Sequence, residues 1–220
     1  MLSYDSLQIT WLGHDGFKII SKSNQEKTIY IDPYKLSKSR KNTHDADLVL
    51  ISHNHFDHLS IEDLTDILNK NTKIVAAEEC VEKLVDLPNE LHGTKPGDKL
   101  TVQDVPIEVV IAYNTNKSFH PKTDNKVGFI IMLDKYRIYH SGDTDMIPEM
   151  EITKPDIAMV PVSGTYVMTA VEAAKATNEL IRPTKFVIPM HYGTIVGSEK
   201  DAIAFRELVK VCETKILNKE

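Results

Sequence analysis

The chain has 220 residues, of which 41% are hydrophobic and 26% are charged, and its formal net charge at pH 7 is −6. These values fit one soluble domain spanning residues 1–220, and they argue against a nucleic-acid-binding protein, which needs a clustered basic face. Because no apolar run reaches membrane-spanning length and the first residues lack a signal-peptide pattern, we expect a cytoplasmic protein without a membrane partner.

Apolar runs predict two sets of strands in chain order. Short strands are expected at residues 7–12, 17–20 and 28–31, as a meander, followed by strands at 48–52 and 73–77. A helix lies between the last two, with Ser60 as its cap and Asp63 in a capping-box relation to it. The second set comprises residues 105–113, 127–133 and 136–140, and Asp134 and Lys135 form the hairpin turn between its last two strands.

Two late helices follow the second set of strands, around a further strand at residues 186–190. Thr169 and Glu172 form a capping box for the first helix, which ends before Pro183, and Ser198 and Asp201 form one for the second. The buried stripe of the second helix is expected to consist of Phe205, Leu208, Val209 and Cys212. Cys212 and Cys80 are both interpreted as core thiols, because neither has metal-ligand spacing.

Strands and helices in this order predict an α+β protein. Two mixed sheets with helices on their outer faces, an αββα sandwich, is the layer arrangement that accommodates these elements.

The segment at residues 53–58 reads His-Asn-His-Phe-Asp-His, directly after an apolar run that predicts a buried strand. By chance this pattern would occur on the order of once in a thousand such sequences. His53 and His55 are two residues apart in an extended segment, so they point the same way and suit one metal ion. Asp57 and His58 come where the chain turns into a helix, so they suit a second position. The segment therefore predicts a metal-ligand cluster.

Three further candidate ligands lie at predicted strand ends. His120 lies in a polar loop between two apolar runs, Asp143 follows the strand at 136–140, and His191 ends the strand at 186–190. Active sites are commonly built from loops at such positions.

These motifs resemble the ligand motifs of the metallo-β-lactamase superfamily, in the same order. The similarity rests on the pattern at 53–58, His120, Gly142-Asp143-Thr144 and His191, with an early acidic motif at Ile31-Asp32-Pro33. The segments 11–14, 161–168 and 189–193 resemble, more narrowly, compact metal-dependent hydrolases related to ascorbate-phosphate lactonase and, more distantly, phosphodiesterases that cleave N-acyl phosphatidylethanolamines. The resemblance covers nearly the whole chain and is specific for fold and metal.

The resemblance implies a role for each ligand. His53, His55 and His120 would hold the first ion, Asp57, His58 and His191 the second, and Asp143 would bridge the two. Nitrogen and oxygen donors of this kind suit zinc, with manganese, iron or cobalt as alternatives. Two divalent ions with this set leave a formal excess of two positive charges, so the site should attract anions.

We therefore predict a dinuclear metal-dependent hydrolase whose bridging hydroxide attacks a small anionic ester, lactone or phosphodiester. Asp57 is expected to orient the nucleophile, and Asp32 to support the ligand loop through hydrogen bonds. Two alternatives stay open, a di-iron redox protein of the same fold and a non-catalytic metal-binding module. Homo-oligomeric assembly is also left open.

Six further residues are candidate substrate contacts, and each has a structural alternative. They are His14, Thr165, Tyr166, Tyr192, Lys38 and Arg40. His14 is expected at the rim of the site or, alternatively, as an ordinary turn histidine. The tyrosines could equally pack near strand ends, and the basic segment at residues 35–41 could equally be a solvated loop. The remaining histidines, His44, His92 and His140, are interpreted as surface or structural.

Overall fold

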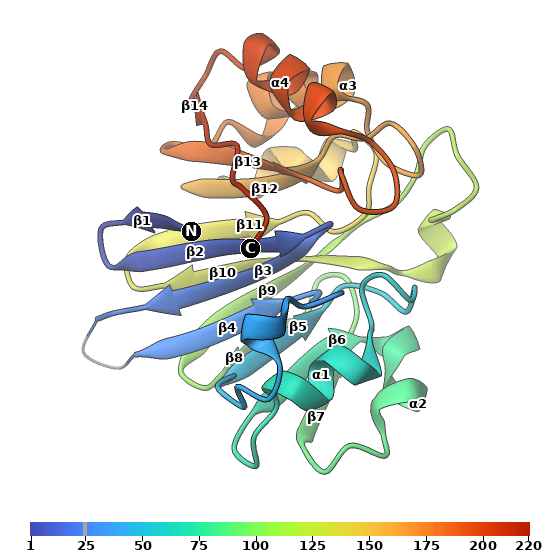
Figure 1. Ribbon diagram of the computed structural model, residues 1–220. Coiled ribbons are helices and arrows are strands. Elements are labelled where there is room, and N and C mark those ends of the chain that lie inside the picture. Colours follow the sequence, from blue (N-terminus) through green and yellow to red (C-terminus); the bar gives the residue numbers. More distant parts are fainter. Residues whose placement is uncertain (24–25) are drawn as a thin grey trace. The chain divides into compact units, whose positions relative to one another are not determined.

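The computed structural model describes residues 1–23 and 26–220, and the chain divides into two compact units. Unit 1 consists of Met1–Thr94, Thr101–Asp104 and Leu217–Glu220, and unit 2 consists of Lys95–Leu100 and Val105–Ile216. Two seven-stranded sheets are formed, one belonging mainly to each unit (Figure 1). That the whole chain acts as a single domain stays a prediction.

The first sheet has the strand order β1-β2-β3-β4-β5-β6-β7. Its strands are β1 Leu2–Tyr4, β2 Leu7–Gly13, β3 Gly16–Ser21, β4 Lys27–Ile31, β5 Leu48–Ile51, β6 Lys73–Ala77 and β7 Glu90–Thr94. Strands β1 to β4 pair antiparallel as the predicted meander, and β4 to β7 pair parallel. The sheet is therefore mixed, and its fully buried side chains include Ile9, Phe17 and Leu50.

The register of this sheet brings three loops to one edge. Phe17 pairs with Ile31, and Ile31 pairs with Leu50, so the start of β3 and the ends of β4 and β5 lie together. Gly16 permits a close approach there, because a Cβ at this position would lie only 3.1 Å from the Asp32 carbonyl oxygen. The β2–β3 turn, the residue after β4 and the loop after β5 consequently meet at the same edge.

Unit 1 carries two short helices, α1 Ile61–Ile67 and α2 Val81–Leu84, and the 3₁₀ turns η1 Lys38–Arg40 and η2 Glu78–Cys80 (Figure 1). Ser60 caps α1 as predicted, since its side chain accepts a hydrogen bond from the Asp63 N–H at 3.2 Å. The predicted second hydrogen bond of a capping box, from the Ser60 N–H to the Asp63 carboxylate, is wrong. The Asp63 carboxylate instead accepts the N–H groups of Lys35 (2.8 Å) and Leu36 (3.0 Å), which fastens the segment after Tyr34 to α1.

The second sheet has the strand order β14-β13-β12-β11-β10-β9-β8. Its strands are β8 Lys99–Val102, β9 Val105–Ile111, β10 Val127–Leu133, β11 Tyr136–His140, β12 Ile157–Pro161, β13 Phe186–Met190 and β14 Glu213–Thr214. β9, β10 and β11 pair antiparallel, whereas β11 to β14 pair parallel. The carboxyl ends of β11, β12 and β13 therefore lie at one edge, together with the loop that joins β9 to β10.

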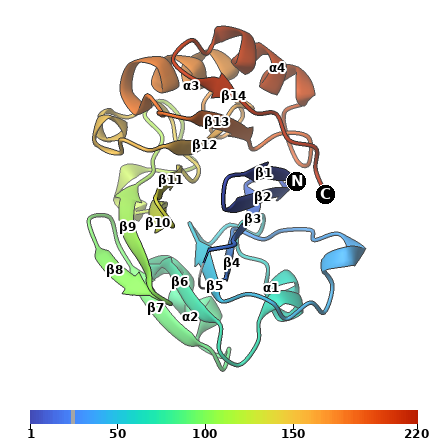
Figure 2. The same cartoon turned by 90° about the vertical axis from the view of Figure 1, so that its left-hand side faces the viewer.

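Helices α3 Ala170–Ala176 and α4 Glu199–Leu208 pack against each other and contact β12 and β13 respectively (Figure 2). The predicted capping box of α3 is confirmed, with Thr169 and Glu172 exchanging hydrogen bonds. α3 continues into a π-helical turn, η5 Thr177–Ile181, and the 3₁₀ turns η3 Lys122–Asp124 and η4 Pro148–Ile152 complete unit 2. Among the described residues, no helix is both long and apolar enough to cross a bilayer.

The end of α4 differs from the prediction. The helix stops at Leu208, so Val209 and Cys212 lie beyond it, and the Leu208 side chain is exposed rather than part of a buried stripe. Cys80 is buried as predicted, but Cys212 is only half-buried, and this burial raises the pKa of its thiol to about 11. Strands β1, β7, β8, β12 and β14 were not predicted. Most of them are short, and sequence periodicity identifies short strands poorly.

Candidate metal centre

The loop after β5 carries His53 and His55, and their rings face one point. His53 Nε2 lies 3.0 Å from His55 Nδ1. The Ser52 hydroxyl donates its one proton to Asp32 Oδ2 at 2.5 Å, so its oxygen accepts a hydrogen bond from His53 Nδ1 at 2.9 Å. A proton on Nδ1 leaves a lone pair on His53 Nε2, which is the state that binds a metal ion.

Asp32 touches both ends of the ligand loop. It accepts the Ser52 N–H at 2.7 Å and lies 2.9 Å from His58 Nδ1. A carboxylate only accepts hydrogen bonds, so the proton of His58 is on Nδ1 and the lone pair is on Nε2. Asp32 and His58 are fully buried. A buried carboxylate on the far nitrogen of a ligating histidine is the usual way in which proteins orient such a ligand.

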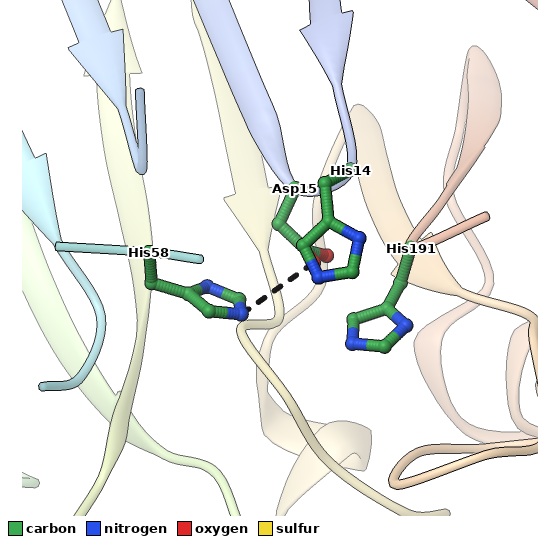
Figure 3. A group of neighbouring side chains, drawn as sticks. All are labelled: His14, Asp15, His58 and His191. Atoms are coloured by element: carbon green, nitrogen blue, oxygen red, sulfur yellow. Dashed lines mark ion pairs between the residues drawn. The ribbon is translucent and has the colours of Figure 1, made fainter. Parts of the chain in front are cut away.

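Asp57 faces the turn between β2 and β3. His14 Nε2 lies 2.9 Å from Asp57 Oδ2, and both His14 and its neighbour Asp15 are fully buried. Figure 3 shows His14, Asp15 and His58 directed toward one another, and Asp15 Oδ2 is 3.7 Å from His58 Nε2. His14 therefore lies against the ligand loop as a buried side chain, and its role as a substrate contact stays a prediction.

Asp15 was not among the site residues predicted from the sequence. Its signal was its place in a two-residue turn beside His14, between Gly13 and Gly16, although only the sheet register shows that this turn meets the ligand loop.

The basic segment at residues 35–41 lies next to the ligand loop, because the Tyr34 ring packs edge-on against Phe56 (5.8 Å between centroids). Its positive charge is smaller than the sequence suggests. Arg40 is paired with Glu220 at 2.7 Å, and Lys41 with Asp66 at 2.7 Å, a contact that raises the pKa of Lys41. Lys38 is exposed.

In unit 2, Asp143 lies between two histidines. Its Oδ2 atom is 3.3 Å from His120 Nε2 and 3.2 Å from His191 Nε2. The three residues come from different loops, after β9, β11 and β13, and all are buried. One carboxylate oxygen thus lies within 3.3 Å of two imidazole nitrogens.

Both histidines of unit 2 direct Nε2 toward Asp143 and have a hydrogen-bond partner on Nδ1. His120 Nδ1 lies 3.1 Å from Asn114 Oδ1, an acceptor, so His120 carries its proton on Nδ1. His191 Nδ1 lies 2.9 Å from Ser163 Oγ, whose own proton is directed to the Thr165 carbonyl oxygen at 3.3 Å. Nitrogen and carboxylate donors of this kind fit zinc, and they also fit manganese or iron.

Residues 144 and 145 fasten the His120 loop to the Asp143 loop. Thr144 Oγ1 accepts the Tyr113 N–H at 3.2 Å. The Asp145 carboxylate accepts the Thr115 N–H at 2.8 Å and pairs with Lys117 at 2.5 Å. Asp145 is nearly fully buried and was not among the site residues predicted from the sequence, although it lies two residues after Asp143.

The predicted substrate contacts of unit 2 are Thr165, Tyr166 and Tyr192, and they differ in exposure to solvent and in the groups that they contact. The Tyr166 ring packs edge-on against the exposed Phe119 (4.5 Å between centroids), and its carbonyl oxygen accepts a hydrogen bond from Asn114. Thr165 is exposed. Tyr192 is 4% exposed, and burial raises the pKa of its hydroxyl to about 12, so it stays protonated at neutral pH.

Four candidate residues adopt a positive φ, a conformation that is uncommon for residues other than glycine. They are His14 (52°), Asp32 (42°), Tyr166 (70°) and His191 (60°). Such backbone conformations cost free energy and cluster at functional sites. The loop beside His191 also requires Gly197, since a Cβ there would lie 2.6 Å from Ser163 Cβ.

The three remaining histidines make structural contacts. His44 Nδ1 lies 2.8 Å from the Leu68 carbonyl oxygen, and His92 lies 2.9 Å from Glu90. His140 is buried, and its Nδ1 accepts the Gly142 N–H at 3.2 Å.

Known proteins resemble this chain over nearly its whole length. The sequence pattern described as "Beta-lactamase superfamily domain" matches residues 8–191. The UPF0173 metal-dependent hydrolase of Thermoplasma acidophilum is 32% identical, over 97% of this chain and 95% of the relative. The structure of a protein from Parabacteroides distasonis is 31% identical with a TM-score of 0.79, over 96% of this chain and 94% of that one. The structure of Igni18, a metallo hydrolase from Ignicoccus hospitalis, is 26% identical with a TM-score of 0.76, over 97% of this chain and 95% of that one. These similarities confirm the predicted fold class.

Proposed function

Because the chain belongs to the metallo-β-lactamase superfamily and is a metal-dependent hydrolase, we propose that it binds two divalent ions and hydrolyses a small anionic ester, lactone or phosphodiester. Its ligands would be those that the motifs imply, namely His53, His55, Asp57, His58, His120, Asp143 and His191. The position of Asp143 between His120 and His191 is the observation that supports two ions best, because a single carboxylate oxygen faces two imidazole nitrogens.

Bound divalent ions would lower the pKa of a water molecule and polarise the carbonyl or phosphoryl group of the substrate. The protein's own groups would orient the reaction. His14 Nε2 contacts Asp57 Oδ2 and would hold this carboxylate in place, which leaves the second Asp57 oxygen to accept the proton of the attacking water. Ser52 and Asp32 would keep His53 and His58 in the tautomer that binds metal.

The proposed substrate is anionic because of the formal charge of the ligand set. Five neutral imidazoles and two carboxylates do not neutralise two divalent ions, so the centre would attract negative charge. Lys38, Arg40, Thr165, Tyr166, Tyr192 and His14 stay proposed substrate contacts. Of these, Lys38 has the strongest support as an electrostatic contact, because it is exposed and the charge of Arg40 is engaged by Glu220.

Zinc is the first candidate for both ions, with manganese and iron as alternatives, because all proposed ligands are nitrogen or oxygen atoms. A cytoplasmic location and assembly into homo-oligomers stay predictions from the sequence.

Metal loading and a substrate panel test this proposal together. Protein purified without chelator, stripped and reloaded with Zn²⁺, Mn²⁺ or Fe²⁺ should approach two equivalents by elemental analysis. Each form is then assayed against matched esters, lactones and phosphodiesters, with a neutral analogue of every anionic compound. We expect one class of anionic compounds to be hydrolysed faster than its neutral analogues. A stoichiometry that never exceeds one ion would contradict the dinuclear site, and hydrolysis of none of the three classes would contradict the substrate assignment.

A further inference from the structure

We propose that Asp15 is a metal ligand, binding the same ion as Asp57 and His58 and adding an oxygen donor that the ligand motifs do not include. This inference rests on the proposed function, since it concerns the second of the two proposed ions. It uses only residues of unit 1, which Figure 3 shows in part.

The distances around Asp15 suit metal ligation. Asp15 Oδ2 lies 3.6 Å from His14 Nε2 and 3.7 Å from His58 Nε2, which is longer than a hydrogen bond. Ligand atoms bound at roughly 2.0–2.2 Å to one ion lie about 3 to 3.5 Å from each other. His58 Nε2 and Asp15 Oδ2 could therefore share an ion after a shift of a few tenths of an ångström.

The protonation state of His58 supports this arrangement. Asp32 occupies Nδ1 of His58 at 2.9 Å, so the Nε2 atom that faces Asp15 carries a lone pair. A lone pair and a carboxylate oxygen repel each other at close range, whereas a cation between them attracts both. Under the proposed function, Asp57, whose Oδ2 atom lies 2.9 Å from His14 Nε2, would supply a third donor from the same unit.

The charge of this region points the same way. Asp15, Asp32 and Asp57 gather around His14 and His58, and four of these five residues are fully buried. Buried carboxylates are costly unless a positive charge compensates them. A divalent cation supplies such compensation, and neither histidine must be protonated for it.

Asp15 would change the chemistry of the second ion. A further carboxylate makes the ligand set richer in oxygen, which favours Mn²⁺ relative to Zn²⁺. It also reduces the formal excess charge of the centre from two to one. The second ion should then be more selective for hard cations than the first, which would be held by three histidines, His53, His55 and His120, with Asp143 shared between the two ions.

Asp15→Asn tests this inference by metal binding, independently of activity. Binding of Zn²⁺ and Mn²⁺ to stripped protein is measured in metal-buffered competition and by elemental analysis. We expect the affinity for one ion to fall about a hundredfold, because losing a group that merely orients a ligand already costs roughly 10- to 100-fold. The loss should be larger for Mn²⁺ than for Zn²⁺. Asp15→Ser, which removes the carboxylate completely, should give the same result.

Asp47→Asn is the matched control. Asp47 accepts the Thr28 N–H at 2.8 Å at the opposite end of β5 from the ligand loop, so its substitution should leave metal affinity unchanged. Thermal unfolding of the metal-free proteins separates folding from binding. Removing a buried negative charge from the Asp15 region should not lower the Tm of the metal-free protein, whereas the rise in Tm caused by metal should become smaller.

Unchanged affinity in both Asp15 variants would overturn the inference, and so would a lower Tm of the metal-free protein without selective loss of one ion. The outcome is distinct from that of the dinuclear proposal. If the wild type binds a single ion and Asp15→Asn weakens it, the dinuclear proposal fails while Asp15 stays a ligand. If the wild type binds two ions and the Asp15→Asn variant binds both with the same affinities, only the Asp15 inference fails.

Discussion

The two units contribute proposed metal ligands in different ways. In unit 1, four of the ligands come from the six residues of the 53–58 segment, directly after β5. In unit 2, His120, Asp143 and His191 come from three loops, each after a different strand. A compact segment needs few tertiary contacts to keep its donors together. Dispersed donors require contacts between loops. In unit 2, Thr144 and Asp145 make such contacts by accepting the N–H groups of Tyr113 and Thr115.

The contacts that orient the ligands differ accordingly. In unit 1 one buried carboxylate, Asp32, reaches Ser52 and His58 and thereby orients two histidines. In unit 2 each histidine has a partner of its own, Asn114 for His120 and Ser163 for His191. Unit 1 should therefore be sensitive to the loss of one residue, whereas the cost in unit 2 should be divided among several.

The largest expected effect concerns Asp57, the ligand of unit 1 with a proposed part in proton transfer. Asp57→Asn should lower kcat roughly a hundredfold or more, because a positioned proton acceptor contributes on this scale. The first ion and the stability should change much less, since His53 and His55 do not depend on Asp57. Turnover of the best panel substrate, metal content and Tm are the measurements. Near-normal turnover at full metal loading would remove the catalytic role.

The next largest effect is expected for Asp32, the buried carboxylate that orients His53 and His58 in unit 1. Asp32→Asn should weaken metal binding roughly 10- to 100-fold, as expected for loss of a carboxylate that orients ligating histidines. Asp32 Oδ1 accepts the Ser52 N–H, whereas Oδ2 accepts the Ser52 hydroxyl and His58 Nδ1, and an amide has an acceptor oxygen at only one of these two positions. Competition with a metal buffer measures the affinity, and Asp47→Asn again serves as the control. Equal affinities in the two variants would show that Asp32 does not orient the ligands.

A smaller effect is expected for the corresponding support in unit 2. Asp145→Ala removes the acceptor of the Thr115 N–H and the partner of Lys117, so the free energy of unfolding should fall by about 1–3 kcal/mol. Metal affinity should decrease less than in Asp32→Asn, because Asn114 still holds His120. Urea unfolding of the metal-free protein measures the first quantity. Glu151→Ala, which alters an exposed carboxylate of η4 in the same unit, should be nearly neutral. A loss of affinity as large as that of Asp32→Asn would erase the contrast between the units.

The smallest effect concerns the basic segment of unit 1. Lys38→Glu should lower kcat/KM for an anionic substrate about two- to threefold at low ionic strength, and the difference should fade with added salt. The effect is modest because Arg40 and Lys41 are already paired with acidic residues. Lys70→Glu, the same charge change in the turn after α1, serves as the control. An equal loss with a neutral substrate would return this segment to the solvated-loop interpretation.

Much of the strand pattern could be predicted because apolar periodicity is a local property. β6, β10 and β11 have the predicted boundaries, and the capping box of α3 is formed as expected. Errors occurred where a local pattern competes with a tertiary contact. Asp63 is placed to complete a capping box, yet the Lys35 and Leu36 N–H groups take its carboxylate. Residues near Leu208 are apolar at helical spacing, but the helix ends there.

The sequence by itself determined the family, the fold class and the chemical types of the proposed ligands, because His-Asn-His-Phe-Asp-His is contiguous and its donors need no folding to be recognised. Tertiary structure decided which further side chains surround them. Asp15 and Asp32 reach the ligand loop only through the register of β3, β4 and β5, and Asn114, Asp145 and Ser163 contact residues far along the chain. Hydrogen bonds between distant loops depend on how close the loops lie in the folded protein. A single sequence contains no periodic pattern that predicts this distance.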